Sequence, residues 1–109
     1  MSQFDVFWNP GRNQDAIPFV VVVQSAAFDK LDRRLVVPLL SEDGLGGSIK
    51  IPHSDTTPIF TVNGRRVVLN PFEMVSVETK RLGLKVSSLS GDGDAITLAL
   101  DEVFSKARG

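Results

Sequence analysis

The only histidine of the chain, His53, lies beside Ser54 and Asp55, which are the residue types of a base, a nucleophile and an orienting acid. In a hydrolytic triad these groups come from separate parts of a fold, because nucleophile, base and acid must stand in line. Three consecutive residues of one polar loop cannot adopt that arrangement. The sequence therefore predicts no serine-type catalytic centre here.

Two glycine-containing segments have part of a ligand-binding motif. Residues 44–47 read Gly-Leu-Gly-Gly but lack the Lys-Ser/Thr ending of a phosphate-binding loop. Residues 92–94 read Asp-Gly-Asp without the distal glutamate of a calcium loop, so a helix cap is the simpler role. The chain has no cysteine, which excludes disulfides, thiolate zinc sites, iron–sulfur clusters and a thiol nucleophile. We expect no cofactor and no metal site.

The charge balance argues against a nucleic-acid reader. Twelve Lys and Arg residues against 13 Asp and Glu give a net charge of -1, so no overall basic field favours nucleic acid or an anionic membrane. Three basic pairs occur, at residues 33–34, 65–66 and 80–81, and alternation along a strand points one member of each pair to solvent. A barrel can also gather such arginines on one rim to grip RNA phosphates, which leaves an RNA-cleaving activity as an alternative.

The last twenty residues have apolar side chains at steps of three and four, as in an amphipathic helix. These positions are Ile96, Ala99, Leu100, Val103, Phe104 and Ala107. Ser90, Asp92 and Asp94 are candidate caps. Two roles are open for Phe104: it packs inside the domain with the rest of the stripe, or it anchors a protein partner.

Several segments before this helix have the composition of β-strands. Residues 4–8 carry three aromatic side chains before an Asn-Pro-Gly turn sequence. Residues 17–28 include four consecutive β-branched residues, which is typical of a central strand, and residues 34–40 predict a second long strand antiparallel to it. Pro38 lacks a ladder donor and is expected at an edge or a bulge.

A hairpin and two further strands complete the predicted sheet. Asn63-Gly64, between residues 58–62 and 65–69, is a strong hairpin signal because both turn positions take positive φ. Residues 72–77 and 82–84 predict two more strands. Five or more strands followed by one helix predict an α+β fold, a small antiparallel barrel or bent sheet with the helix packed against it.

The length of 109 residues is that of one domain, so residues 1–109 are expected to fold around one core. Residues 41–57 predict a long excursion with a short strand near 49–51. The longest apolar run, residues 17–23, is far shorter than the roughly 20 residues that cross a bilayer. The N-terminus lacks the layout of a secretory signal, so the expected location is the cytoplasm.

Blocks of residues along nearly the whole chain resemble the CcdB family of toxins. They agree with that family in order and spacing through the first strand, the two long strands, the hairpin and the strand after it, and the terminal helix agrees as well. The matching positions are Gln3, Phe4, Val6, Phe7, Val21, Val23, Gln24, Ser25, Asp29, Arg33, Arg34, Val36, Val37, Pro38, Leu39, Pro58, Phe60, Val62, Gly64, Leu69, Val75, Ser76 and Val77.

The resemblance implies a small SH3-like barrel with a long C-terminal helix, as in Kid and MazF, and a symmetric homodimer formed through a sheet-and-helix surface. It implies the toxin of a type II toxin-antitoxin system that binds the GyrA subunit of DNA gyrase, traps the cleaved-DNA complex and is neutralised by a CcdA-like antitoxin. Such a toxin breaks no covalent bond itself, so the resemblance implies a protein that is not an enzyme. It also implies a protein that binds neither nucleic acid by itself nor a membrane. Phe104, Phe28 and Ser25 are the partner-binding residues that it indicates.

The C-terminal tail departs from the family pattern. The plasmid toxins of the family end in Phe-Trp-Gly-Ile, and the last three of these residues are needed for poisoning. Here Phe104 is followed by Ser105, Lys106 and Ala107, so the indole is missing. The sequence predicts weak poisoning through the family's contacts. The alternatives are a Kid/MazF-like endoribonuclease and a non-toxic homologue that only binds an antitoxin.

Overall fold

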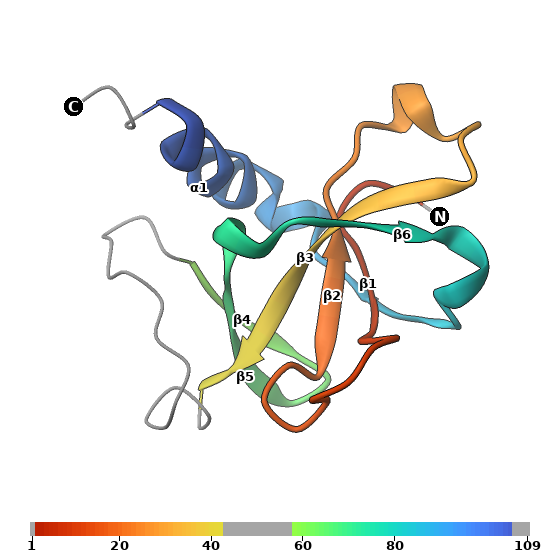
Figure 1. Ribbon diagram of the computed structural model, residues 1–109. Helices are drawn as coiled ribbons and strands as arrows, with labels where there is room; N and C mark the ends of the chain where they lie inside the picture. Colours follow the sequence, from red (N-terminus) through yellow and green to blue (C-terminus); the bar gives the residue numbers. More distant parts are fainter. Residues whose placement is uncertain (1, 43–57, 106–109) are drawn as a thin grey trace.

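The computed structural model describes residues 2–42 and 58–105, which form one curled antiparallel sheet and one C-terminal helix (Figure 1). The strand order is β4-β5-β3-β2-β1-β7, and β6 pairs with β3. The strands are β1 (Asp5–Trp8), β2 (Phe19–Val22), β3 (Arg33–Ser41), β4 (Ile59–Val62), β5 (Arg65–Leu69), β6 (Val75–Glu78) and β7 (Lys85–Ser88), and the helix is α1 (Gly93–Ser105). This architecture confirms the predicted α+β fold, a curled sheet of the half-barrel kind.

The centre of the sheet is the antiparallel pair of β2 and β3, as the two long apolar segments predict. Every residue of β2 is buried, because β1 and β3 flank the strand and both of its faces are covered. The strand is shorter than the predicted residues 17–28, since it ends at Val22. Ser25 accepts a hydrogen bond from the Ala27 amide through its side chain, which favours the 3₁₀ helix η1 (Ala26–Phe28) over a continued strand.

Pro38 lies inside β3, an interior strand, so its predicted place at an edge or bulge is wrong. The Pro38 carbonyl accepts a hydrogen bond from the Asn70 amide at 3.0 Å. The nitrogen and the carbonyl of a strand residue point to the same side, and on that side β3 changes its partner from β6 to β5. The missing N–H therefore falls at a break in the ladder and costs no pairing.

The hairpin prediction is confirmed. Asn63 and Gly64 have φ angles of 53° and 80° and connect β4 to β5. Both turn residues are thus in the left-handed region that two-residue hairpins of this twist require. The next two predicted strands are displaced along the chain. Residues 72–77 begin with the 3₁₀ helix η3 (Pro71–Glu73) before β6, and residues 82–84 precede β7.

The reason for the first displacement is a local cap. The Asn70 side chain accepts a hydrogen bond from the Phe72 amide, and proline follows Asn70 at the first helical position, an arrangement that starts a helical turn. A further 3₁₀ helix, η4 (Thr79–Arg81), precedes β7, but no side chain caps its N-terminus. The predicted excursion over residues 41–57 begins after β3 ends at Ser41, and residues 43–57, with the predicted strand at 49–51, lie outside the described residues.

The curled sheet encloses two apolar cores. The larger core lies between the sheet and α1, and the smaller core lies on the other side of β1 and β2. The larger one contains Val6, Phe19, Val21, Val37, Leu39, Phe60, Val62, Val67, Leu69, Leu89, Ile96 and Ala99, and the smaller one contains Phe7, Val20, Val22, Val36, Val77 and Leu82. The helix contributes Ile96 and Ala99 to the larger core, so this contact holds α1 against the sheet.

Helix α1 begins where Gly93 touches the ring of Phe4. A Cβ atom added at Gly93 would lie 2.6 Å from a ring carbon of Phe4. Phe4 itself has a φ of 70° and is held by two backbone hydrogen bonds, from its amide to the Val22 carbonyl and from the Leu89 amide to its carbonyl. The ring therefore cannot move away cheaply, and only glycine fits at this position.

We expect Gly93→Ala to lower the free energy of unfolding by about 1–3 kcal/mol, because the added methyl group overpacks the contact with Phe4. Thermal unfolding followed by circular dichroism measures the change. Gly91→Ala is the matched control, since a Cβ at Gly91 meets nothing within 4 Å, and it should stay within about 0.5 kcal/mol of the unchanged protein. Equal stability of the two variants would contradict the close approach.

Candidate functional site

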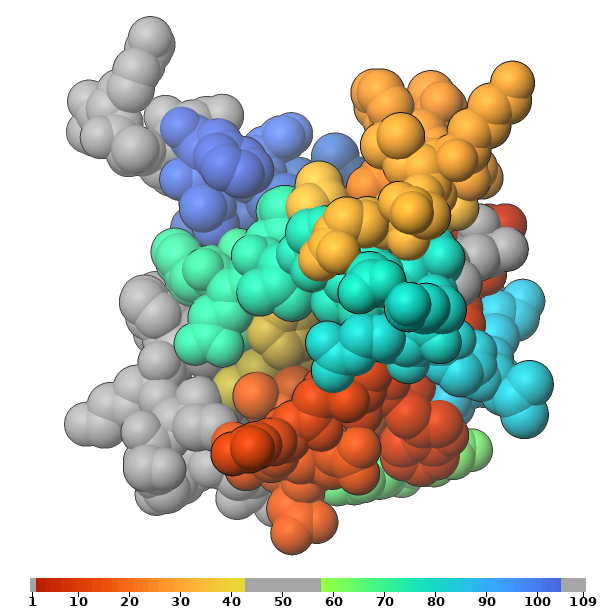
Figure 2. Space-filling model, turned by 45° about the vertical axis from the view of Figure 1, so that its right-hand side comes forward, coloured from red at the N-terminus to blue at the C-terminus, as the bar shows by residue number. Residues whose placement is uncertain are grey.

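Two projections extend from one end of the sheet. One is the segment that connects β2 to β3, residues 23–32, which carries η1, and the other is α1 (Figure 1). Figure 2 shows them as separate bodies, the connection in orange and the helix in blue, with the segment around η3 and β6 in green between their bases. We call the connection the β2–β3 loop. The sequence-predicted site residues all lie on these two projections.

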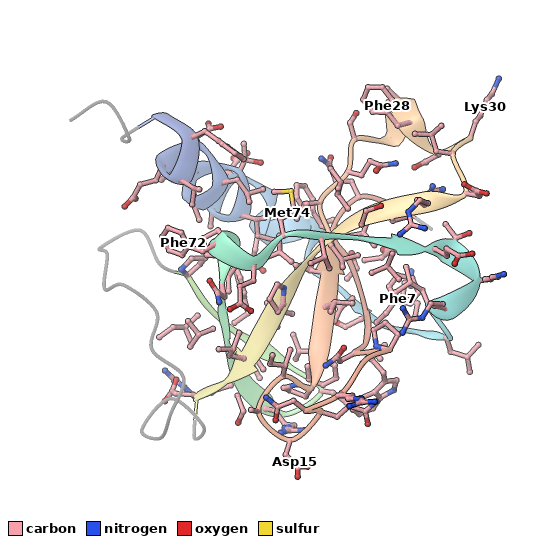
Figure 3. The ribbon with its side chains drawn as sticks, in the orientation of Figure 1. Phe7, Asp15, Phe28, Lys30, Phe72 and Met74 are labelled. Atoms are coloured by element: carbon pink, nitrogen blue, oxygen red, sulfur yellow. The ribbon has the colours of Figure 1, made fainter. Side chains whose placement is uncertain are left out.

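The β2–β3 loop carries Phe28 and Ser25. Phe28 is the last residue of η1, and its side chain is 56% exposed. Figure 3 shows it at the outer end of the loop, away from the sheet. Ser25 is exposed and caps η1, because its Oγ accepts a hydrogen bond from the Ala27 amide. Ser25 therefore shapes the loop, and Phe28 is the side chain that the loop presents.

The helix carries Phe104 near its C-terminal end. The apolar stripe of the sequence splits in the structure: Ile96 and Ala99 are buried, whereas Phe104 is 68% exposed. Of the two roles that the sequence left open for Phe104, the structure excludes core packing within the described protomer. An aromatic side chain exposed at the end of a helix has the chemistry of an anchor for a protein partner.

Between the two projections lies a third set of exposed apolar side chains, which sequence analysis did not single out. They come from β3, η3 and β6 and are Leu35, Phe72 and Val75. η3 contacts α1, and Figure 3 shows Phe72 and Met74 below the helix. We call Leu35, Phe72 and Val75 the apolar saddle. In the register of β3 and β6, Val75 shares the face of Val36, so Leu35 and Val75 point to opposite faces of the sheet. The apolar saddle is therefore a set of exposed residues on adjoining elements and not one continuous patch.

The sequence did not predict the apolar saddle, because the exposure of its residues depends on how β3 and β6 pair. Val75 pairs with Val36 and Leu35 with Ser76, and the predicted strand over residues 72–77 gave no sign of which of its residues the sheet would leave uncovered. The only sequence signal was the aromatic residue at Phe72 beside a proline.

Trp8, the single tryptophan, lies away from this end of the molecule. It pairs with Phe19 at the beginning of β2, and the two ring centroids are 4.9 Å apart. The β2–β3 loop follows the opposite end of β2 (Figure 1). Trp8 therefore does not stand in for the tryptophan that is missing from the C-terminal tail.

One concavity of the described residues lies in the loop between β1 and β2. This concavity of about 550 Å³ is lined by Gly11, Arg12, Asn13, Gln14 and Asp15, all of one loop, and this lining holds no hydroxyl or imidazole beside its carboxylate. In residues 2–42 and 58–105, no three His, Cys, Asp or Glu side chains are close enough together to hold a metal ion. His53 and residues 44–47 lie outside the described residues.

The three basic pairs make local contacts. In the first pair Arg34 is buried and Arg33 is exposed, as strand alternation predicts, whereas both members of the pairs at 65–66 and 80–81 are exposed. Their contacts are Arg33 with Ser76, Arg65 over the ring of Phe19, Arg66 with Glu42, Lys80 with Glu78 and Arg81 with the Pro10 carbonyl. These basic side chains contact other groups of the same protomer, and no contact among the described residues gathers them on one rim of the sheet. The described contacts therefore do not favour the RNA-cleaving alternative.

Within the described part of the chain, no helix has both the length and the apolar content to cross a membrane. Comparison with protein families matches residues 3–105 to the family described as CcdB protein. The match spans the sheet, the β2–β3 loop and α1. No curated protein sequence matches the chain.

Proposed function

The chain belongs to the CcdB family, and from this premise we propose that it is a toxin that acts by binding the GyrA subunit of DNA gyrase. Family membership supports a toxin of a toxin-antitoxin system of the CcdB kind. That gyrase is the target goes beyond this family match, and it is what we propose. In this proposal residues 1–109 act as one toxin domain in the cytoplasm.

The observation that carries the proposal is the exposure of two large aromatic side chains, Phe28 and Phe104, on the two projections. A buried aromatic side chain removes about 150–250 Å² from water, so a protein partner that covers both gains two anchors. Aromatic side chains at the centre of an interface supply much of the binding energy. The two projections thus form a surface that is suited to a protein partner.

The mechanism in this proposal is binding without bond chemistry. A ligand that binds one state of an enzyme more tightly than the others shifts the population towards that state. To raise one state of the enzyme from 1% to 99% of the population, a ligand must bind that state about 10⁴-fold more tightly than the other state. A toxin that binds gyrase more tightly when its DNA is cleaved would therefore hold the enzyme in that state and accumulate broken DNA.

Two further partners belong to the proposal. Phe72 of the apolar saddle is exposed and lies on η3, which contacts α1, and a symmetric homodimer through a sheet-and-helix surface would bury it. The second partner is a CcdA-like antitoxin. A disordered acidic tail that folds onto the toxin would compete with gyrase if it covers Phe28 or Phe104.

Expression in a gyrase-containing host tests the proposed target. We expect growth arrest, binding of purified protein to GyrA, and more gyrase-cleaved DNA. Absence of all three would reject gyrase as the target. In that case binding of a CcdA-like antitoxin would identify a non-toxic homologue, and cleavage of mixed-sequence RNA would identify the endoribonuclease alternative.

We expect Phe28→Ala and Phe104→Ala each to weaken binding to GyrA by about tenfold or more, because each removes an aromatic anchor from the interface. Isothermal titration calorimetry measures the affinity, and unfolding curves establish that the variants stay folded. Leu84→Ala is the matched control, since Leu84 is 86% exposed but lies in the η4–β7 connection. A similar loss of affinity in all three variants would contradict the proposed surface.

A further inference from the structure

The β2–β3 loop has no apolar interior that could fix its shape. None of the residues of η1 is buried, and residues 25–33 are all exposed. Phe28 and Leu31, its two large apolar residues, are each 56% exposed. A segment of this kind loses conformational entropy on folding without burying apolar surface in return. Polar contacts must therefore hold it.

The strongest of these contacts come from Arg34, whose side chain enters the loop from β3. Arg34 is only 5% exposed. Its Nη1 donates to the Leu31 carbonyl at 2.5 Å and to the Arg33 carbonyl at 2.9 Å, and its Nη2 donates to the Asp29 carbonyl at 2.6 Å. One planar guanidinium thus connects the end of η1, the bend after it and the start of β3.

The chemistry of these contacts needs arginine. Its fork carries donors in fixed directions, whereas a lysine ammonium is a point charge on a flexible stem. Asp29 ends η1 as its C-cap, and a cation at the carbonyl end of a helical turn is also electrostatically favourable. The Asp29 carboxylate lies 3.9 Å from the Arg34 Nε, and that nitrogen has no hydrogen-bond partner among the described residues.

Gln24 supplies a second, exposed clamp. Its amide nitrogen donates to the Phe28 and Arg33 carbonyls at 3.2 and 3.3 Å, and its amide oxygen accepts from the Leu35 amide. These bonds are longer and solvent-exposed, so they contribute less than the buried guanidinium.

We propose that Arg34 is the positioning residue of the partner-binding surface: it holds the β2–β3 loop in one conformation and so presents Phe28 to the target before binding. Preorganisation of this kind raises affinity because the ordering cost is met during folding instead of at the interface. This inference rests on the proposed function only in its target, since the ordering of the loop is a property of the protomer itself.

The first test measures loop order without any partner. In Arg34→Lys we expect the ¹⁵N order parameters of Phe28, Asp29 and Leu31 to fall from about 0.85 to below about 0.6, while those of α1 stay near 0.85. Arg33→Lys is the matched control, because the Arg33 guanidinium points away from the loop and donates to Ser76. Unchanged loop order in Arg34→Lys, or equal loss in both variants, would overturn the inference.

The second test asks whether Arg34 acts on binding through Phe28. We expect Arg34→Lys to weaken binding to purified GyrA about tenfold and the double variant with Phe28→Ala to bind as Phe28→Ala alone does, since residues that act through one another are not additive. Additive losses would show that Arg34 acts elsewhere and overturn the positioning role. If the unchanged protein does not bind GyrA, the proposed target fails, while the order parameters still decide the role of Arg34.

A measurement on the unchanged protein covers the case in which Arg34→Lys does not fold. The Arg34 Nη hydrogens should give separate NMR signals, because hydrogen bonds to three carbonyls stop the rotation of the guanidinium. The exposed Arg12 supplies the reference for free rotation. A freely rotating Arg34 guanidinium would overturn the inference.

Discussion

Replacing the tail residues by Ser105→Trp, Lys106→Gly and Ala107→Ile should raise the affinity for GyrA by about 30- to 1,000-fold. A buried tryptophan anchor contributes about 2–4 kcal/mol to binding, and the same change removes a lysine charge from an apolar contact. Phe104, the residue before these three positions, is exposed. Calorimetry with purified GyrA and the yield of gyrase-cleaved DNA measure the gain.

The matched control for this gain differs in the indole alone. Ser105→Ala, Lys106→Gly and Ala107→Ile together change the same three positions and remove the same charge. We expect this control to gain less than tenfold in affinity, well below the gain from a tryptophan anchor. Equal affinities of the two tails would contradict the role of the indole, and an unchanged yield of gyrase-cleaved DNA with both tails would mean that the tail does not determine the strength of poisoning.

Removing the main contact between α1 and the sheet should have the largest effect on stability. Ile96 is 0% exposed and belongs to the larger core, so Ile96→Ala is expected to lower the free energy of unfolding by about 2–5 kcal/mol. The loss combines the transfer energy of the deleted methylene and methyl groups with the cavity that they leave. Urea unfolding at one fixed protein concentration measures it, because a homodimer makes stability depend on concentration.

Leu98 provides the matched control on the same helix. It is two residues further along α1 and 56% exposed, so Leu98→Ala should change the stability by no more than about 0.5 kcal/mol. An equal loss in both variants would mean that α1 does not pack through Ile96. Small effects in both would mean that the helix contributes little to the larger core.

Local signals in the sequence were sufficient for the hairpin and the helix. Asn63-Gly64 has a steric reason to form one kind of turn, and the spacing from Ile96 to Val103 follows the period of a helix. They were not sufficient for strand ends. Residues 17–28 and 72–77 include apolar residues that suit a strand, but Ser25 and Asn70 cap short 3₁₀ helices within or just before those ranges.

In the candidate site too, some residues were predicted from the sequence and others were found only in the structure. The resemblance placed Phe28, Ser25 and Phe104 on the partner-binding surface, and the structure puts them on two projections at one end of the sheet. The apolar saddle was missed, because the exposure of Leu35 and Val75 depends on how β3 and β6 pair and on what covers them. Neither fact is local to a short stretch of sequence.

The sequence by itself determined the alternation and periodicity of the elements, the position of the hairpin, and a family pattern carried by residues spread over the chain. Only the tertiary structure decided which members of those patterns face solvent. Ile96 and Phe104 belong to one apolar stripe, yet the sheet covers the first and not the second. Arg33 and Arg34 are neighbours of one type, yet one is exposed and the other is buried among loop carbonyls. Burial depends on which distant elements approach a side chain, and a local pattern does not contain that information.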